Sequence, residues 1–104
     1  MKCTVFVPMM IINDRRYLYV NLSAEDVMKC TKKTKVDIDP LQGSVLKVKV
    51  PFRYNRVMCK VNGLKTIQEL KKGDIIDIRI EYTGTWKTLE GDIGSTWNLV
   101  EIFT

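Results

Sequence analysis

The sequence predicts a mostly β protein with short helices, and three observations support this class. Apolar and polar residues alternate in several short segments, most regularly over residues 44–50 and 74–82. Turn-forming pairs such as Asn13-Asp14 and Asn62-Gly63 separate these segments. The chain has 104 residues, of which 45% are hydrophobic and 28% charged, and this suits a small core. We therefore expect a single domain over residues 1–104.

The first half of the chain predicts a hairpin followed by a helix. Residues 3–12 and 15–22 are rich in β-forming residues and are separated by Asn13-Asp14. In the second of these segments, Tyr17 and Tyr19 share one face, opposite an aliphatic face. Ser23 can cap a short helix from Ala24 to about Lys32.

The middle of the chain predicts a second hairpin. Residues 44–50 alternate so that Lys47 and Lys49 face outward, and residues 56–62 form the returning strand. This pairing places Lys60 opposite or near Lys47. Because two like charges opposite each other repel, we expect an anionic ligand there or lysine side chains that splay into solvent.

The last third of the chain predicts a short helix and two more strands. Residues 66–72 begin with a capping box and end at glycine, which is typical of a helix of one or two turns. Residues 74–82 and 96–103 read as strands, with Trp97 in the core. The glycine-rich residues 83–95 between them read as a long loop.

A short helix between the third and fourth strands of a five-stranded Greek-key barrel is the arrangement of the OB-fold. The predicted order fits a small OB-like barrel if one strand of the first half closes it. A β-grasp-like α+β fold is the alternative, because it also combines a hairpin, a helix and later strands.

The composition argues against catalysis, a metal site and a membrane span. The chain has no histidine, and none of the common nucleotide-binding, hydrolase or zinc-protease motifs occurs. Its three cysteines, Cys3, Cys30 and Cys59, are widely spaced, which indicates a reducing compartment rather than a disulfide scaffold or a zinc site. No window approaches 18 consecutive apolar residues. We expect no enzyme activity, no cofactor, no metal and no membrane partner.

The charge distribution indicates an anionic partner. The net charge is +5, and ten basic residues against two acidic ones fall between Lys29 and Lys65. No acidic residue occurs between Asp39 and Glu69. A middle region this basic favours binding to a polyanion, although a solvated lysine-rich surface is the simpler alternative.

Basic and aromatic residues interleave in the pattern that single-stranded nucleic acid requires, where cations contact phosphates and flat rings stack on bases. The candidate binding residues are Lys47, Lys49, Arg53, Tyr54, Arg56, Lys60, Trp86, Tyr17 and Tyr19. The alternatives are that the arginines only solubilise a turn, and that the two strand tyrosines pack across strands or against another subunit.

Residues 45–103 resemble the OB-fold single-stranded DNA-binding proteins of large nucleocytoplasmic DNA viruses. The resemblance rests on the basic segment 49–63, the segment 67–74 that ends in Gly-Asp, and Tyr-Thr-Gly-Thr-Trp at 82–86 with Trp-Asn-Leu at 97–99. It implies DNA binding during viral replication or repair, without catalysis, in the cytoplasm or nucleus of an infected cell. It also implies that the basic hairpin and Trp86 carry the binding.

The expected function is sequence-tolerant binding of single-stranded nucleic acid, with DNA favoured over RNA by the resemblance. A β-rich protein-interaction or dimerisation module is the alternative, in which the Tyr17 and Tyr19 strand accepts a partner strand. The expected partner is a single-stranded nucleic acid, and a second copy of the chain is left open as a further partner.

Overall fold

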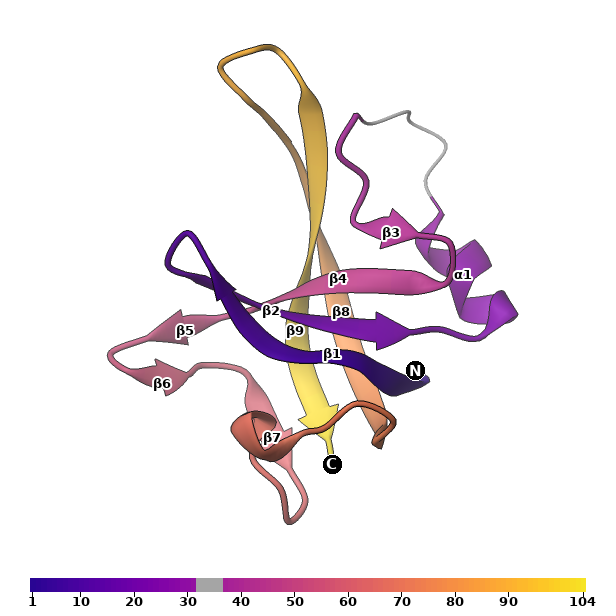
Figure 1. Cartoon of the computed structure of the whole chain (residues 1–104), viewed down its shortest axis with the longest axis vertical. Coiled ribbons are helices and arrows are strands. Elements are labelled where there is room, and N and C mark those ends of the chain that lie inside the picture. Colours follow the sequence, from indigo (N-terminus) through magenta and orange to yellow (C-terminus); the bar gives the residue numbers. More distant parts are fainter. Residues whose placement is uncertain (32–36) are drawn as a thin grey trace.

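The computed structural model describes residues 1–31 and 37–104, and strands dominate it (Figure 1). In chain order the elements are β1 (Lys2–Ile12), β2 (Arg15–Asn21), α1 (Ala24–Cys30), β3 (Leu41–Gln42), β4 (Val45–Val50), β5 (Phe52–Arg53), β6 (Arg56–Val57), β7 (Lys60–Asn62), the 3-10 turn η1 (Ile67–Glu69), β8 (Ile75–Lys87) and β9 (Ile93–Phe103). The mostly β class is confirmed.

Five of these strands close into a small barrel. β1 lies between β2 and β8, β2 also pairs with β4, and β8 pairs with β9, all antiparallel. β9 then returns to β4 through two parallel residue pairs, Val48 with Trp97 and Lys49 with Asn98. Around the ring the order is β1-β2-β4-β9-β8 and back to β1. This ring confirms the small OB-like barrel, and it takes two strands from the first half of the chain rather than one.

Alternation along the strands fills the barrel. The buried aliphatic side chains come from every strand of the ring and include Val5, Leu18, Val20, Leu46, Val48, Val50, Ile76, Ile78, Leu99 and Ile102. Full burial of each such side chain contributes roughly 1.5–3 kcal/mol. Trp97 packs partly buried against this core, and its ring centroid lies 5.2 Å from that of Tyr82. The predicted inward faces of residues 44–50 and 74–82 are therefore confirmed.

The first hairpin and the helix follow the sequence pattern. Asn13 and Asp14 have φ angles of 50° and 64°, the left-handed conformation of a tight hairpin turn between β1 and β2. The Ser23 hydroxyl accepts a hydrogen bond from the Asp26 amide and caps α1. α1 ends at Cys30, and Lys32, where the sequence predicted its end, lies outside the described residues.

The predicted return strand over residues 56–62 is wrong. β2 and β9 occupy the two sides of β4, and β3 also pairs at its beginning, so β4 has no room for a further neighbour. Instead β5 and β6 form a separate two-stranded hairpin, and β7 pairs in parallel with β9. Lys47 is opposite Tyr19, not Lys60. Lys60 lies against the Glu101 carboxylate at 3.6 Å.

The predicted helix over residues 66–72 is reduced to the single turn η1. The Thr66 side chain makes no capping hydrogen bond, so the capping box is absent. The chain turns toward β8 after Leu70, and the Lys71 amide donates to the Asp74 carboxylate at 2.9 Å. Ile67 and Leu70 are nevertheless buried. In the part of the chain that the structure describes, no helix has the length and apolar character to cross a bilayer.

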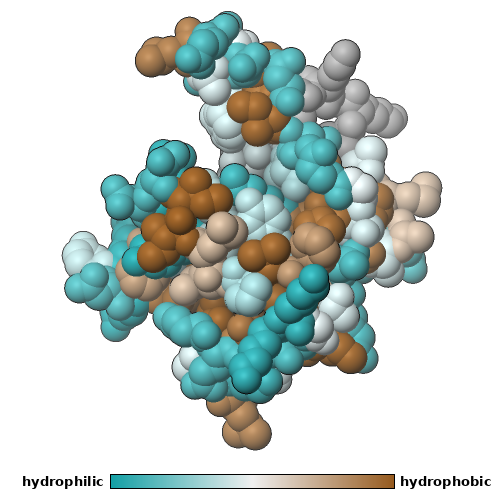
Figure 2. All heavy atoms as spheres, in the orientation of Figure 1, coloured by the Kyte–Doolittle hydropathy of each residue, from teal (hydrophilic) through white to brown (hydrophobic). Residues whose placement is uncertain are grey.

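The predicted long loop over residues 83–95 is mostly strand. β8 continues to Lys87 and β9 begins at Ile93, so the two strands extend past the barrel as a two-stranded arm. We call Thr83–Lys87 and Ile93–Thr96, with the turn between them, the arm. Figure 2 shows the arm as a lobe at the top of the molecule, with a notch between it and the body on the left of the view. Threonine and tryptophan favour strands, and this preference outweighs the glycines here.

Candidate functional site

The outer face of β2 and β4 carries two tyrosines and two lysines. Tyr17 pairs with Lys49 and Tyr19 with Lys47, so aromatic and basic side chains lie side by side across the two strands. All four residues are half-buried. The Lys47 ammonium lies 4.1 Å from the centre of the Tyr17 ring, which is a cation–π distance. This face forms the floor of the candidate site.

The arm forms one wall of the site and holds Trp86. Trp86 and Gly94 are direct partners in the β8–β9 ladder, and the indole ring lies across the glycine. A Cβ atom at residue 94 would overlap the ring, so only glycine permits this packing. The indole N–H donates to the Thr96 hydroxyl at 2.8 Å. The ring is 42% exposed and is fixed from one side, which is the condition for a preformed stacking surface.

Residues 37–42 form the opposite wall and are hydrogen-bonded to the arm. The amides of Asp37 and Ile38 both donate to the Ile93 carbonyl, at 2.7 and 3.0 Å. The Asp37 carboxylate accepts from the Ile93 amide at 2.8 Å. Ile38 also forms a parallel bridge with Gly94. These bonds fix the distance between the two walls.

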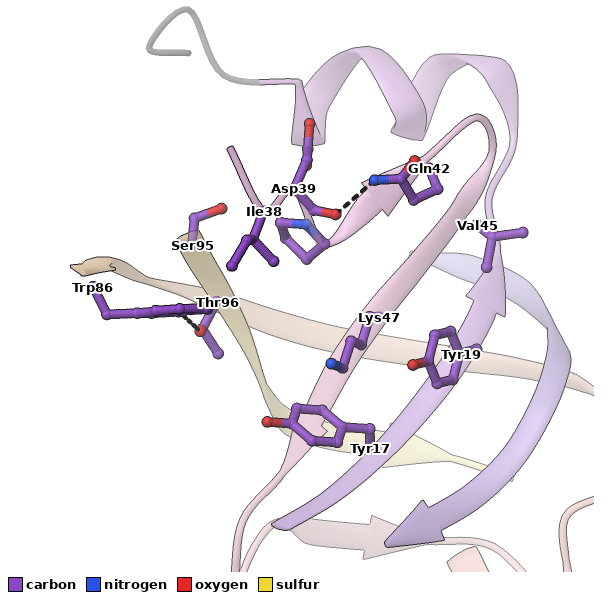
Figure 3. A pocket seen from close by; sticks show the side chains of 11 residues that line it. Tyr17, Tyr19, Ile38, Asp39, Gln42, Val45, Lys47, Trp86, Ser95 and Thr96 are labelled. Atoms are coloured by element: carbon purple, nitrogen blue, oxygen red, sulfur yellow. Dashed lines mark hydrogen bonds between the residues drawn. The ribbon is translucent and has the colours of Figure 1, made fainter. Parts of the chain in front are cut away.

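A hollow of about 220 Å³ lies between the walls and the floor. Figure 3 shows Tyr17, Tyr19 and Lys47 on the floor, Trp86 and Thr96 on the arm, and Ile38 pointing into the space between them. A flat ring with an apolar face and a polar edge suits such a lining. A second hollow of about 390 Å³ adjoins it and shares Tyr17, Trp86 and Thr96. We call the two hollows together the groove.

The second hollow contains basic residues and an unpartnered amide. Arg15, Lys49 and Asn98 line it. The register places Asn98 beside Lys49 of β4 and beside Glu81 of β8. The Asn98 Oδ1 atom is buried and has no hydrogen-bond partner in residues 1–31 and 37–104. An unsatisfied buried polar atom costs about 1–3 kcal/mol in a folded protein. Such an atom is free to accept a hydrogen bond from a water or from a ligand donor.

The groove is suited to binding a ligand, and its lining residues include no thiol that could act as a nucleophile. Burial raises the pKa of the Cys3 thiol to about 12, and burial also raises the pKa of Cys59. Both thiols therefore stay protonated near neutral pH, and neither lines the groove. Among residues 1–31 and 37–104, no three side chains of the types that bind metals converge. What the groove offers is flat rings, ammonium and guanidinium groups, and hydroxyls.

The structure divides the nine candidate residues predicted from the sequence. Five of them line the groove, namely Tyr17, Tyr19, Lys47, Lys49 and Trp86. Arg53, Tyr54 and Arg56 lie on the separate β5–β6 hairpin, residues Phe52–Val57, which we call the knob. Lys60 lies in neither place, because it is held by Glu101, which is also 3.8 Å from Arg79.

Sequence reasoning missed Asn98 and the wall of residues 37–42. Each becomes part of the site only through pairing with a distant strand, and no local pattern records such pairing. The predicted binding of a partner strand by β2 is wrong. β2 is paired with β1 on one side and β4 on the other, so its edge is not free.

A scan of protein-family models and searches of curated proteins and of solved structures found no match to this chain.

Proposed function

We propose that this protein binds single-stranded nucleic acid, DNA in the first instance, in the groove and without strong sequence preference. One observation carries the proposal. The groove joins a fixed, half-exposed tryptophan to two tyrosines and two lysines on one face of an OB-like barrel. In OB-folds, the face of the second and third strands and the loop between the fourth and fifth strands bind oligonucleotides.

The groove lies at that position in this barrel. β2 and β4 are the second and third barrel strands, and the arm joins the fourth to the fifth. Lys47 and Lys49 have no carboxylate partner among the described residues, so they suit phosphates. The rings of Tyr17, Tyr19 and Trp86 suit bases. Bases are accessible for stacking in a single strand and are occupied in a duplex, so the groove favours the single strand.

The resemblance to viral single-stranded DNA-binding proteins supports the same proposal. Two parts of the resemblance, the basic residues of β4 and the segment ending at Trp86, meet in the groove. DNA as the natural ligand, and a role in replication or repair of a viral genome, rest on the resemblance alone and belong to the proposal.

The test is the fluorescence anisotropy of a labelled single-stranded oligonucleotide at about 50 and about 200 mM salt. Because phosphate contacts release counterions, we expect affinity to fall steeply with salt, and a labelled duplex to bind more weakly. Trp86→Ala should lower the affinity about 5- to 150-fold, the equivalent of about 1–3 kcal/mol for one stacked base. Leu89→Ala, a fully exposed residue at the tip of the same arm, is the matched control and should bind like the wild type.

Absence of binding at low salt would contradict the proposal. Binding that is insensitive to salt, or equal binding of Trp86→Ala and Leu89→Ala, would contradict the mechanism.

A further inference from the structure

The knob is the strongest basic and aromatic feature outside the groove. Tyr54 is 87% exposed, and Arg53 and Arg56 beside it are exposed as well. No hydrogen bond, ion pair or ring contact holds these three side chains within the described residues. Among the described residues, neither Arg53 nor Arg56 forms an ion pair with a carboxylate.

The turn of the knob holds Tyr54 in a backbone conformation that tyrosine rarely adopts. Tyr54 and Asn55 have φ angles of 52° and 61°, and the turn between β1 and β2 has nearly the same angles at Asn13 and Asp14. That first turn carries residues that tolerate the left-handed conformation, whereas tyrosine does so poorly. A large ring kept in a strained position, and left in solvent, indicates that the ring has a ligand.

The base of the knob is fixed to the barrel. The Arg16 guanidinium of β2 lies 3.4 Å above the centre of the Phe52 ring. Val57 packs against the core, and the Met58 amide donates to the Pro51 carbonyl at 2.9 Å. The exposed side chains of Arg53, Tyr54 and Arg56 therefore stand on a supported hairpin.

β4 leads from the groove directly into the knob. Lys47 and Lys49 face the groove. β4 ends at Val50, and β5 begins at Phe52 after the single residue Pro51. Figure 1 shows the knob at the far end of β4 from β3. Arg53 is six positions after Lys47 in the sequence, and an extended chain of six residue steps spans roughly 20 Å. The basic groups thus continue along one direction, from the first hollow through the second to the knob.

We propose that the knob is a second binding site for the same single strand, on the stretch that leaves the groove at the end of β4. Tyr54 stacks on a base, and Arg53 and Arg56 contact the flanking phosphates. This inference rests on the proposed function of the groove. It adds a path for the strand, and it makes affinity depend on strand length.

The experiment compares wild type and Tyr54→Asn with thymidine homopolymers from about 4 to about 16 nucleotides, the range of site sizes of OB barrels. Asparagine is favoured at this turn position, so the variant removes the ring and keeps the hairpin. We expect wild-type affinity to rise sharply beyond a threshold length. Tyr54→Asn should lose about tenfold in affinity for strands above that length and bind shorter strands normally.

Arg53→Ala with Arg56→Ala should act in the same way and also reduce the salt dependence for long strands only. Lys29→Ala with Lys71→Ala removes the same charge from exposed positions outside the groove and the knob, and should leave the length series unchanged. Equal loss at every length, or no loss at any length, would overturn the inference.

Two further results distinguish a failure of the groove proposal from a failure of the knob proposal. If Trp86→Ala leaves short strands bound normally, the proposed function of the groove fails, whatever the knob variants do. If the knob variants leave DNA affinity unchanged and alter sedimentation of the protein alone, the knob contacts a second copy of the chain, and the inference is overturned.

Discussion

The groove and the knob carry the same kinds of side chain, but the fold holds the groove side chains in place much more firmly. Both combine lysine or arginine with tyrosine or tryptophan. The floor side chains of the groove are half-buried, and Trp86 is held by Gly94 and Thr96. The knob side chains are exposed, and only the base of their hairpin is fixed. Ordering a side chain costs free energy, so a residue already held by the fold contributes more to binding.

This difference predicts that the groove sets the affinity and the knob adjusts it. It also shows that a basic and aromatic sequence segment does not reveal by itself how well its residues are positioned. Changes at Gly94 and Asn98 alter the groove and leave the knob intact, whereas a change at Asp74 alters the barrel that carries both.

The largest effect is expected from Gly94→Ala. The new methyl group overlaps the Trp86 ring, which must leave its place and its bond to Thr96. Gly94 does not have a positive φ, so the backbone itself tolerates alanine. We expect a loss in affinity at least as large as that of Trp86→Ala, and a loss of about 1–3 kcal/mol in the free energy of unfolding. Anisotropy and urea unfolding measure the two. Leu89→Ala, at the exposed tip of the same arm and outside both hollows, is the control. A Gly94→Ala variant that binds normally would disprove the role of the fixed ring.

A smaller and opposite effect on stability is expected from Asn98→Ala. Removing the unpartnered Oδ1 atom relieves a buried polar group, so the free energy of unfolding should rise by about 1 kcal/mol. Affinity for single strands should fall severalfold, because a ligand N–H donor loses its acceptor. Urea unfolding and anisotropy on the same samples give both values. A variant that is less stable than the wild type would show that Asn98 has a structural partner.

The smallest effect concerns Asp74, which directly precedes β8 and whose carbonyl accepts a hydrogen bond from the Val5 amide of β1. Hydrogen bonds from the Lys71 amide and the Lys65 ammonium lower the pKa of Asp74 below its usual 3.8. Its contribution to stability is therefore fully present above pH 3.8 and is lost as the pH falls through the lowered value. Asp74→Asn should be less stable than wild type at neutral pH, and the difference should shrink in acid. Urea midpoints from about pH 7 to about pH 2 measure it. A difference that does not change with pH would rule out the charge as its cause.

Local patterns predicted those parts of the fold that local interactions determine. The alternation over residues 44–50 and 74–82, the Asn13-Asp14 turn and the Ser23 cap are all confirmed, because each depends on residues a few positions apart. The partner of β4 could not be predicted in this way. Residues 56–62 have the right alternation for it, but β2 and β9 pair with β4 instead, and strand pairing is a competition among distant segments.

The candidate site shows the same division. The outward faces of Tyr17, Tyr19, Lys47 and Lys49 follow from period-two alternation, and the structure brings them together with Trp86. The arm was missed because three glycines suggest a loop. In fact Gly94 is required by the ring that packs on it, which only the cross-strand register reveals. Whether these residues bind nucleic acid stays a prediction.

β4 and β9 close the barrel through only two residue pairs, and this predicts where the barrel opens transiently. So short a seam is the natural place for the ring to open, and its amides should exchange with solvent before those of the longer ladders. Lys49 on one side of the seam and Asn98 and Thr96 on the other line the same groove. A single-stranded nucleic acid bound across these residues should hold the seam closed, so that ligand binding stabilises the fold.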